Sequence, residues 1–227
     1  MKRSEINRAL REMEAALQKY QISLPPFCHF TPEEWKEKGA DYNEIRDNML
    51  GWDITDYGLN KFEKVGFSLI TLRNGNVKKK DQYAKTYAEK LIFLKEGQYS
   101  PNHFHWNKME DIINRCGGVL LIRVFNSLPD ESVDQSSDVT VHLDGRTVTV
   151  PAGTQVRLEE GMSISIQPGL YHDFSVEPGS GDIIIGEVSQ CNDDNTDNRF
   201  CPPVGRFPAI EEDEPPYRLL CNEYPQA

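Results

Sequence analysis

The stretch Gly97-Gln-Tyr-Ser-Pro-Asn-His103-Phe-His105-Trp-Asn-Lys108-Met-Glu110, which runs on to Gly117, contains three side chains that suit a metal ion. His103 and His105 lie two residues apart, so on an extended strand both imidazoles point to the same face. Glu110 can return to the same point from the turn that follows. Two neutral imidazoles and one carboxylate suit divalent Mn, Fe, Co, Ni or Zn. The stretch therefore predicts a metal site.

A fourth ligand is expected further along the chain, and His172 is the candidate. This histidine ends the segment Gly161-Met-Ser-Ile-Ser-Ile-Gln-Pro-Gly-Leu-Tyr-His172, where turn residues follow an apolar run. A lone histidine is usually structural, but three histidines and one glutamate at these spacings favour metal binding. The predicted ligand set is His103, His105, Glu110 and His172.

Length and composition are those of a soluble globular protein. The chain has 227 residues, of which 38% are hydrophobic, and this length fits one domain with a substantial core. Its formal net charge of −11 opposes binding to phosphate backbones. The basic run Lys78-Lys79-Lys80 is expected to be a solvated loop. We therefore predict no nucleic-acid partner.

The cysteines and the N-terminal residues indicate a cytoplasmic protein. The five cysteines are widely spaced and form no C-x-x-C pair, which fits reduced thiols better than a disulfide framework. The first residues lead into an amphipathic charged segment rather than an apolar signal sequence. No apolar run reaches the length of about 18 residues that a membrane span requires, so we predict no membrane association.

The chain is predicted to form a single domain, 1–227, with three parts. These are an N-terminal helical covering segment (1–60), a β-barrel core (61–200) and an irregular C-terminal tail (201–227). Apolar residues at helical spacing predict a helix over the first twenty residues, with Ser4 as its cap. Thr31-Pro32 predicts the start of a second helix, and a third is expected from Tyr42 to Leu50.

From about Phe67 the sequence changes to short strands bounded by turn residues, which is typical of a β-sandwich or barrel. The predicted strands span 67–72, 90–94, 118–125, 139–143, 146–150, 155–158, 162–166, 172–176 and 182–188. Asp144-Gly145 predicts a two-residue hairpin turn between two of them.

The spacing from Gly97 to Gly117 matches the first motif of the cupin superfamily, G-x5-H-x-H-x4-E-x6-G, without a mismatch. The second motif is looser, because Pro168 lies one place late and Val176 replaces an asparagine. The chain thus resembles the cupins, roughly from Lys90 to Val188, which implies a mainly β fold, the double-stranded β-helix or jelly-roll barrel. We expect the N-terminal α-helices to pack on it. The resemblance also implies the four ligands predicted above.

Cupin ligands do not fix a reaction, since enzymes of many classes and inert binding proteins share them. Lys108 lies between two of the ligands, where we expect a cation beside the metal to have a depressed pKa and to pass protons or hold substrate oxygens. A lysine that bends out to solvent is the alternative. Glu187 places an acid on an otherwise apolar strand face with Ile183 and Ile185, which favours a functional role. The loop that begins Asn192-Asp193-Asp194 is rich in carboxylates and amides. It fits sugar hydroxyls better than calcium.

The segments His-Phe-His-Trp-Asn-Lys-Met-Glu-Asp, Gly186-Glu187-Val-Ser and Asn192-Asp193-Asp194 closely resemble the D-lyxose isomerase family, over most of the chain. This resemblance implies interconversion of D-lyxose and D-xylulose, and of D-mannose and D-fructose. It further implies a monosaccharide substrate, a divalent metal, above all Mn²⁺, and a homodimer.

Such a reaction moves a proton from C2 to C1 through an enediol, while negative charge builds on adjacent oxygens. We predict Glu187 as the base and Lys108 as the group that moves protons between oxygens, with the two roles exchangeable. Lys90 and Asp193 are candidates for binding distal hydroxyls. A hydride shift, an Fe(II) cupin dioxygenase and a non-catalytic sugar-binding cupin remain the alternatives.

Overall fold

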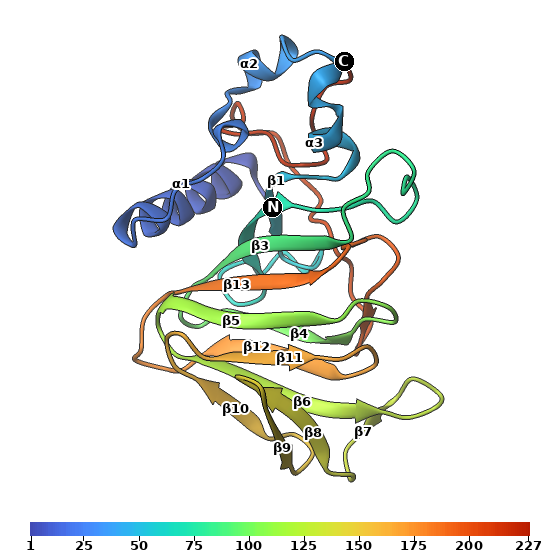
Figure 1. The fold of residues 1–227 in the computed structure, drawn as a ribbon. Coiled ribbons are helices and arrows are strands. Elements are labelled where there is room, and N and C mark those ends of the chain that lie inside the picture. The colour runs from blue at the N-terminus through green and yellow to red at the C-terminus, as the bar shows by residue number, and fades with distance from the viewer.

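The computed structural model describes residues 1–227, and it consists of two antiparallel β-sheets with helices gathered beside one edge (Figure 1). The helices are α1 (Arg3–Lys19), α2 (Pro32–Lys36) and α3 (Asn43–Asp47), with short 3-10 turns η1 (Pro26–His29) and η2 (Ala40–Tyr42). The strands are β1 (Gly51–Thr55), β2 (Phe67–Arg73), β3 (Tyr87–Leu94), β4 (Tyr99–Phe104), β5 (Glu110–Gly117), β6 (Leu120–Ser127), β7 (Val133–Asp134), β8 (Val139–Leu143), β9 (Arg146–Val150), β10 (Gln155–Leu158), β11 (Ser163–Ile166), β12 (Tyr171–Val176), β13 (Ile183–Gln190) and β14 (Arg199–Phe200).

The larger sheet has the strand order β1-β2-β3-β13-β5-β11-β8-β9, and the smaller sheet has the order β10-β6-β12-β4-β14, with β7 paired to β6. Apolar side chains from both sheets alternate into the space between them and form one core, which includes Leu69, Ile92, Ile122 and Ile185. The predicted mainly β barrel is therefore confirmed. Asp144 and Gly145 both have positive φ and join β8 to β9, as the predicted hairpin turn requires.

A second core lies between α1 and the outer face of the larger sheet. Ile6, Leu10 and Met13 of α1 pack there against Leu91 and Phe93 of β3. Because side chains alternate along a strand, Lys90 and Ile92 on β3 point the opposite way, toward the barrel interior. Lys90 and Ile92 line the cavity described below.

The N-terminal segment differs from its prediction in two respects. Helix α3 ends at Asp47, and Gly51–Thr55 forms an additional strand, β1, that pairs with β2. The predicted cap of α1 is also wrong, since Lys2 is the N-cap and Ser4 lies in the first turn, where it binds Asp213. The predicted cap of α2 is confirmed, because Thr31 accepts a hydrogen bond from the Glu34 backbone.

None of the helices is long and apolar enough to cross a membrane.

One end of the barrel lies where β4 ends and β5 begins, and the predicted metal ligands belong to this end. Strand β12 of the smaller sheet pairs with β4 there, and β13 of the larger sheet pairs with β5. Side chains from both sheets therefore meet at this end.

Candidate active site

The three predicted histidines converge at this end of the barrel. His103 lies on β4 directly opposite His172 on β12, and His105 follows β4 in the next turn. All three are buried, and their ligand atoms lie within 4.8 Å of one another. Cross-strand pairing thus brings together residues that are far apart in the sequence.

Backbone carbonyls fix the orientation of each imidazole ring. The Nδ1 atoms of His103, His105 and His172 lie 2.9, 2.7 and 3.1 Å from the carbonyl oxygens of Pro101, Asp197 and Leu170. A carbonyl oxygen only accepts hydrogen bonds, so each Nδ1 carries a proton, and in the neutral tautomer that this selects Nε2 presents a lone pair. Hydrogen bonds of this kind orient the histidines of metal sites.

Glu110, the first residue of β5, faces the same point from the larger sheet. Its Oε1 lies 3.3 Å from Nε2 of His105 and 3.1 Å from Nε2 of His172. Imidazole lone pairs and a carboxylate oxygen this close repel each other unless a cation or a proton lies between them. Nε2 of His172 has no hydrogen-bond partner in the structure. Burial lowers the pKa of His103 well below its ordinary value, which favours the neutral ring. The donor set therefore fits a divalent metal ion.

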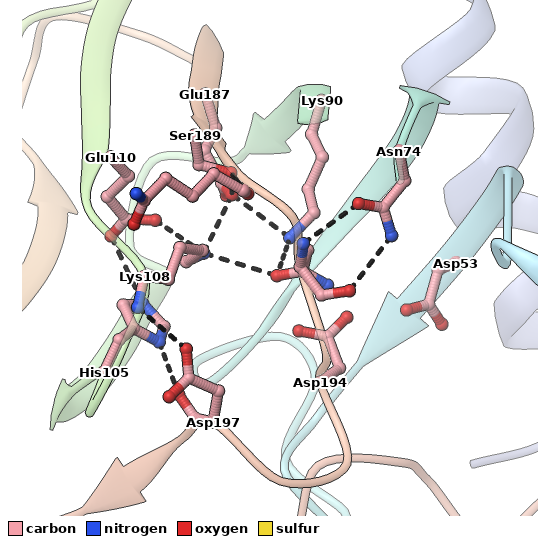
Figure 2. A network of polar contacts seen from close by, with 12 residues as sticks. Asp53, Asn74, Lys90, His105, Lys108, Glu110, Glu187, Ser189, Asp194 and Asp197 are labelled. Carbon is pink, nitrogen blue, oxygen red and sulfur yellow. Dashed lines mark hydrogen bonds and ion pairs between the residues drawn. The ribbon is translucent and has the colours of Figure 1, made fainter. Parts of the chain in front are cut away.

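Beside these ligands lies a buried network of charges (Figure 2). Lys108 Nζ is 2.6 Å from Oε2 of Glu110 and 2.9 Å from Oε1 of Glu187. Lys90, which is directly opposite Glu187 in the pairing of β3 with β13, places Nζ 3.2 Å from the same Oε1. Ser189 Oγ donates to that oxygen at 3.2 Å. The Glu187 carboxylate is therefore held by two ammonium groups and one hydroxyl.

Burial and the neighbouring charges act in opposite directions on these groups. Burial opposes ionisation of Glu187, but Lys108 and Lys90 outweigh it and hold its pKa below the usual value. For Glu110, Lys108 and His105 likewise outweigh burial and hold the pKa well below its ordinary value. The pKa of Lys108 is raised, since the two carboxylates overcome the effect of burial. The depressed pKa that we expect for Lys108 beside a bound metal ion stays a prediction. The lysine is buried and does not bend out to solvent.

The loop after β13 divides its polar residues between two cavities. The metal cavity is lined by the three histidines, Glu110, Lys108 and Glu187, and the second cavity is lined by residues that include Asn48, Asn74 and Lys78. Asp193 lines the second cavity and pairs with Lys78, at 3.0 Å. Asp194 lines both cavities, and Arg206, whose Nη2 lies 3.0 Å from Oδ2 of Asp194, lines the metal cavity. The substrate-binding role predicted for Asp193 stays a prediction.

Three residues near the site had not been singled out in the sequence: Asn192, Asp194 and Arg206. Asn192 Oδ1 accepts hydrogen bonds from Lys90 and Lys108, and Arg206 Nη2 also binds Oδ2 of the buried Asp53. Asn192 and Asp194 belong to the loop whose composition indicated sugar recognition. Arg206 lies in the tail that we had expected to be irregular, where no motif marked it.

The wall of the metal cavity combines charged and aromatic surfaces. The polar groups described above share it with Tyr57, Phe67, Phe174 and Phe200. Small polar ligands are commonly bound between a few precisely placed polar groups and an apolar wall. The cavity can therefore hold a hydroxylated molecule next to the ligand set and the lysine–glutamate pair.

Comparisons with known proteins agree over the full length of the chain. The sequence model of the D-lyxose isomerase family matches residues 1–224. The D-lyxose/D-mannose isomerase of Escherichia coli O157:H7 is 46% identical over 227 residues, which cover 100% of this chain and 99% of that protein. The protein of the same name from Serratia proteamaculans is 45% identical over 225 residues, covering 99% and 98% of the two chains.

Solved structures of L-ribose isomerases share the fold. The enzyme from Cellulomonas parahominis, solved with L-ribose, superimposes with a TM-score of 0.60 at 16% identity, over 93% of this chain and 98% of the other. The enzyme from Acinetobacter sp. DL28, also in complex with L-ribose, gives a TM-score of 0.56 at 14% identity, over 88% and 92%. The structures show the common cupin-like barrel, and the sequence matches show that this chain belongs to the D-lyxose isomerase family of sugar isomerases.

Proposed function

We propose that this protein interconverts D-lyxose and D-xylulose, and D-mannose and D-fructose, with a divalent metal ion at its centre. The observation that supports this most is the placement of the buried Lys108–Glu187 pair directly beside three converging histidines and Glu110. An aldose–ketose isomerase needs these two parts together, a cation site for oxygens and a group that moves protons. The names of the family and of the relatives, D-lyxose isomerase and D-lyxose/D-mannose isomerase, support this choice of sugars.

In this proposal His103, His105, Glu110 and His172 hold the ion, and Mn²⁺ is the first candidate, with Co, Zn, Ni or Fe as the others. The bound ion supplies Lewis-acid stabilisation of the negative charge that builds on O1 and O2. The imidazole lone pairs are already oriented by their carbonyl partners, so little reorganisation accompanies binding.

Glu187 is the proposed base. Its depressed pKa keeps it ionised near neutral pH, so it can take the proton from C2 and return a proton to C1. Lys108, in contact with it, donates a proton to O1 and accepts one from O2 as the carbonyl group moves from C1 to C2. The net change is one C–H bond broken at C2 and one formed at C1, with one O–H bond broken at O2 and one formed at O1. No oxidant or reductant is needed.

The remaining polar groups are proposed to hold the sugar. Lys90 is buried beside Glu187 and lines the metal cavity, so its ammonium can donate to a hydroxyl. Asp194 and Arg206 line the same cavity and can accept from and donate to distal hydroxyls. Asp193, on the neighbouring cavity, is a proposed contact for the end of the longer hexose chain.

Two further assignments are proposed, of which the family resemblance supports the first. We propose a homodimer, which sedimentation equilibrium would distinguish from a monomer. We also propose that the protein works in the cytoplasm, which fits its five free cysteines.

Metal removal tests the proposed function. Protein stripped with a chelator should form no D-xylulose from D-lyxose, and adding Mn²⁺ should restore ketose formation, as followed by NMR. Equal rates with and without metal would contradict the role of the ion. If no pentose or hexose yields a ketose under any metal, the isomerase proposal fails, and oxygen uptake with Fe(II) becomes the next assay.

A further inference from the structure

A chain of amides, formed by the half-buried Asn192 and the buried Asn74 and Asn48, links the metal site to the loop after β2. The two lysines that contact Glu187 also donate to Asn192 Oδ1, Lys90 at 2.7 Å and Lys108 at 3.3 Å. Asn192 is therefore a shared acceptor for both ammonium groups. The position of the Asn192 backbone therefore determines the position of this acceptor oxygen.

Asn74 holds the backbone of Asn192 by two hydrogen bonds (Figure 2). The backbone N–H of Asn192 donates to Asn74 Oδ1 at 2.9 Å, and Asn74 Nδ2 donates to the carbonyl oxygen of Asn192 at 3.0 Å. Asn74 is itself fixed by Asn48. Its Nδ2 donates to the Asn48 carbonyl at 3.2 Å, and Asn48 Nδ2 donates to the Asn74 carbonyl at 3.1 Å. Side-chain amides that are buried and fully bonded give a network a single geometry.

The two loops that carry this network are in close contact. Asn74 and Asn48 are 5% and 2% exposed. A Cβ atom added at Gly75 would lie 1.9 Å from the carbonyl oxygen of Lys85 and 2.3 Å from Sγ of Cys191, the residue before Asn192. A shift of the Asn192 backbone away from the loop after β2 would therefore break its two hydrogen bonds to Asn74.

We propose that Asn74 is a positioning residue of this isomerase, which fixes Asn192 and through it the ammonium groups of Lys90 and Lys108 against Glu187. Asn74 lines the second cavity and not the metal cavity, so it lies away from the carbons between which the proton moves. This inference rests on the proposed roles of Glu187 and Lys108. Lysine has a long flexible stem, and a displacement of about 1 Å in a catalytic group can reduce the rate about a hundredfold.

A double-mutant cycle tests this role. Asn74→Ala and Asn192→Ala should each lower kcat by about ten- to hundredfold, with a much smaller change in KM. If Asn74 acts through Asn192, the double variant should be within about threefold of Asn192→Ala alone. Mn²⁺ affinity, measured by calorimetry, should be unchanged in all three, because no metal ligand is altered. If Asn74→Ala does not fold, Asn74→Asp takes its place, since it retains the acceptor for the Asn192 N–H and loses the donor.

Asn114→Ala is the matched control. Asn114 is also a buried amide that joins two backbone segments, donating to the carbonyls of Gly118 and Leu158 at 2.9 and 3.0 Å, but it does not line the metal cavity. Its loss should lower the melting temperature with little change in kcat, and its effect should multiply with that of Asn192→Ala.

Two outcomes would overturn the inference: an Asn74 variant with wild-type kcat, or effects of Asn74→Ala and Asn192→Ala that multiply in full. Failure of the underlying function has a different signature. If Glu187→Gln and Lys108→Met both retain turnover, the proposed roles of Glu187 and Lys108 are wrong, whatever the cycle shows.

Discussion

The carboxylate of Glu187 is the side chain on which the proposed chemistry depends most. Glu187→Gln keeps the shape and removes the base, so kcat should fall by about 10²- to 10⁴-fold. Binding of Mn²⁺ and of sugar should persist, because the ligand set is intact. Steady-state kinetics with calorimetry checks both statements, and Glu160→Gln, on an exposed turn, should leave kcat unchanged. Substantial turnover in Glu187→Gln would remove the assignment of the base.

Lys108 stabilises two buried carboxylates, Glu110 and Glu187. Lys108→Met leaves both without their closest cation, so the free energy of unfolding of the metal-free protein should fall by about 3 kcal/mol at pH 7. Urea denaturation measures this change. The exposed Lys80→Met serves as the control.

The pH dependence of this effect has a definite sign. In the wild type the cations hold the pKa of Glu187 below its usual value. The stability that this shift contributes is present above the unfolded pKa of about 4.3 and is lost as pH falls through the lower folded pKa. In Lys108→Met the carboxylates take up protons at a higher pH. The difference in unfolding free energy between variant and wild type should therefore narrow from pH 7 to pH 4, and a constant difference would show that charge is not its cause.

The metal ligands could be predicted from the sequence because His103, His105 and Glu110 lie within one short segment whose spacing reflects one strand and one turn. His172 could be predicted as the fourth ligand from its place at the end of the segment that begins at Gly161. The contacts of Asn192, Asp194 and Arg206 depend instead on how loops far apart in the chain pack together. No local pattern encodes such packing, so the contacts of these residues became evident only in the structure, although Asn192 and Asp194 lie in the loop whose composition indicated sugar recognition.

At the scale of elements, most strands could be predicted as short apolar runs, whereas β1, β4 and β5 could not. Polar residues interrupt β4 and β5, and β1 is a run of only five residues, Gly51–Thr55, that includes Asp53. Strand β14 has only two residues and carries no pattern. Strands β1 and β14 pair at the edges of their sheets, where neighbouring strands determine the structure more than local preference does.

Helix α1 stabilises the barrel through its apolar face and does not line the metal cavity. Leu10 is fully buried in that interface, so Leu10→Ala should lower the free energy of unfolding by about 2–5 kcal/mol. The kcat of the folded enzyme should stay close to wild type. Denaturant titration and kinetics below the melting temperature check this, with Gln18→Ala on the exposed side of α1 as the control. A large loss of kcat at full folding would mean that α1 also shapes the site.

At the scale of the whole molecule, the predicted metal joins the two sheets. His103 and His172 belong to the smaller sheet, and Glu110 begins β5 of the larger one. Mn²⁺ at about a hundred times its Kd should raise the free energy of unfolding by about 2.7 kcal/mol, which is about 5–10 °C in Tm. Calorimetric scans with and without Mn²⁺ measure the shift. The shift should be mostly lost in His172→Ala and kept in His142→Ala, since His142 lies on β8 and does not line the metal cavity. An unchanged Tm in the wild type would argue against a metal ion that joins the two sheets.

The most direct test of metal-dependent proton transfer is the fate of the hydrogen that enters C1 of the ketose. D-lyxose should be incubated with the Mn²⁺-loaded enzyme in D₂O and the product examined by NMR. We predict D-xylulose that carries solvent deuterium at C1, because Glu187 exchanges its proton with solvent before returning it. D-xylulose without any deuterium at C1 would contradict transfer through an exchanging base, and absence of ketose would contradict the isomerase itself.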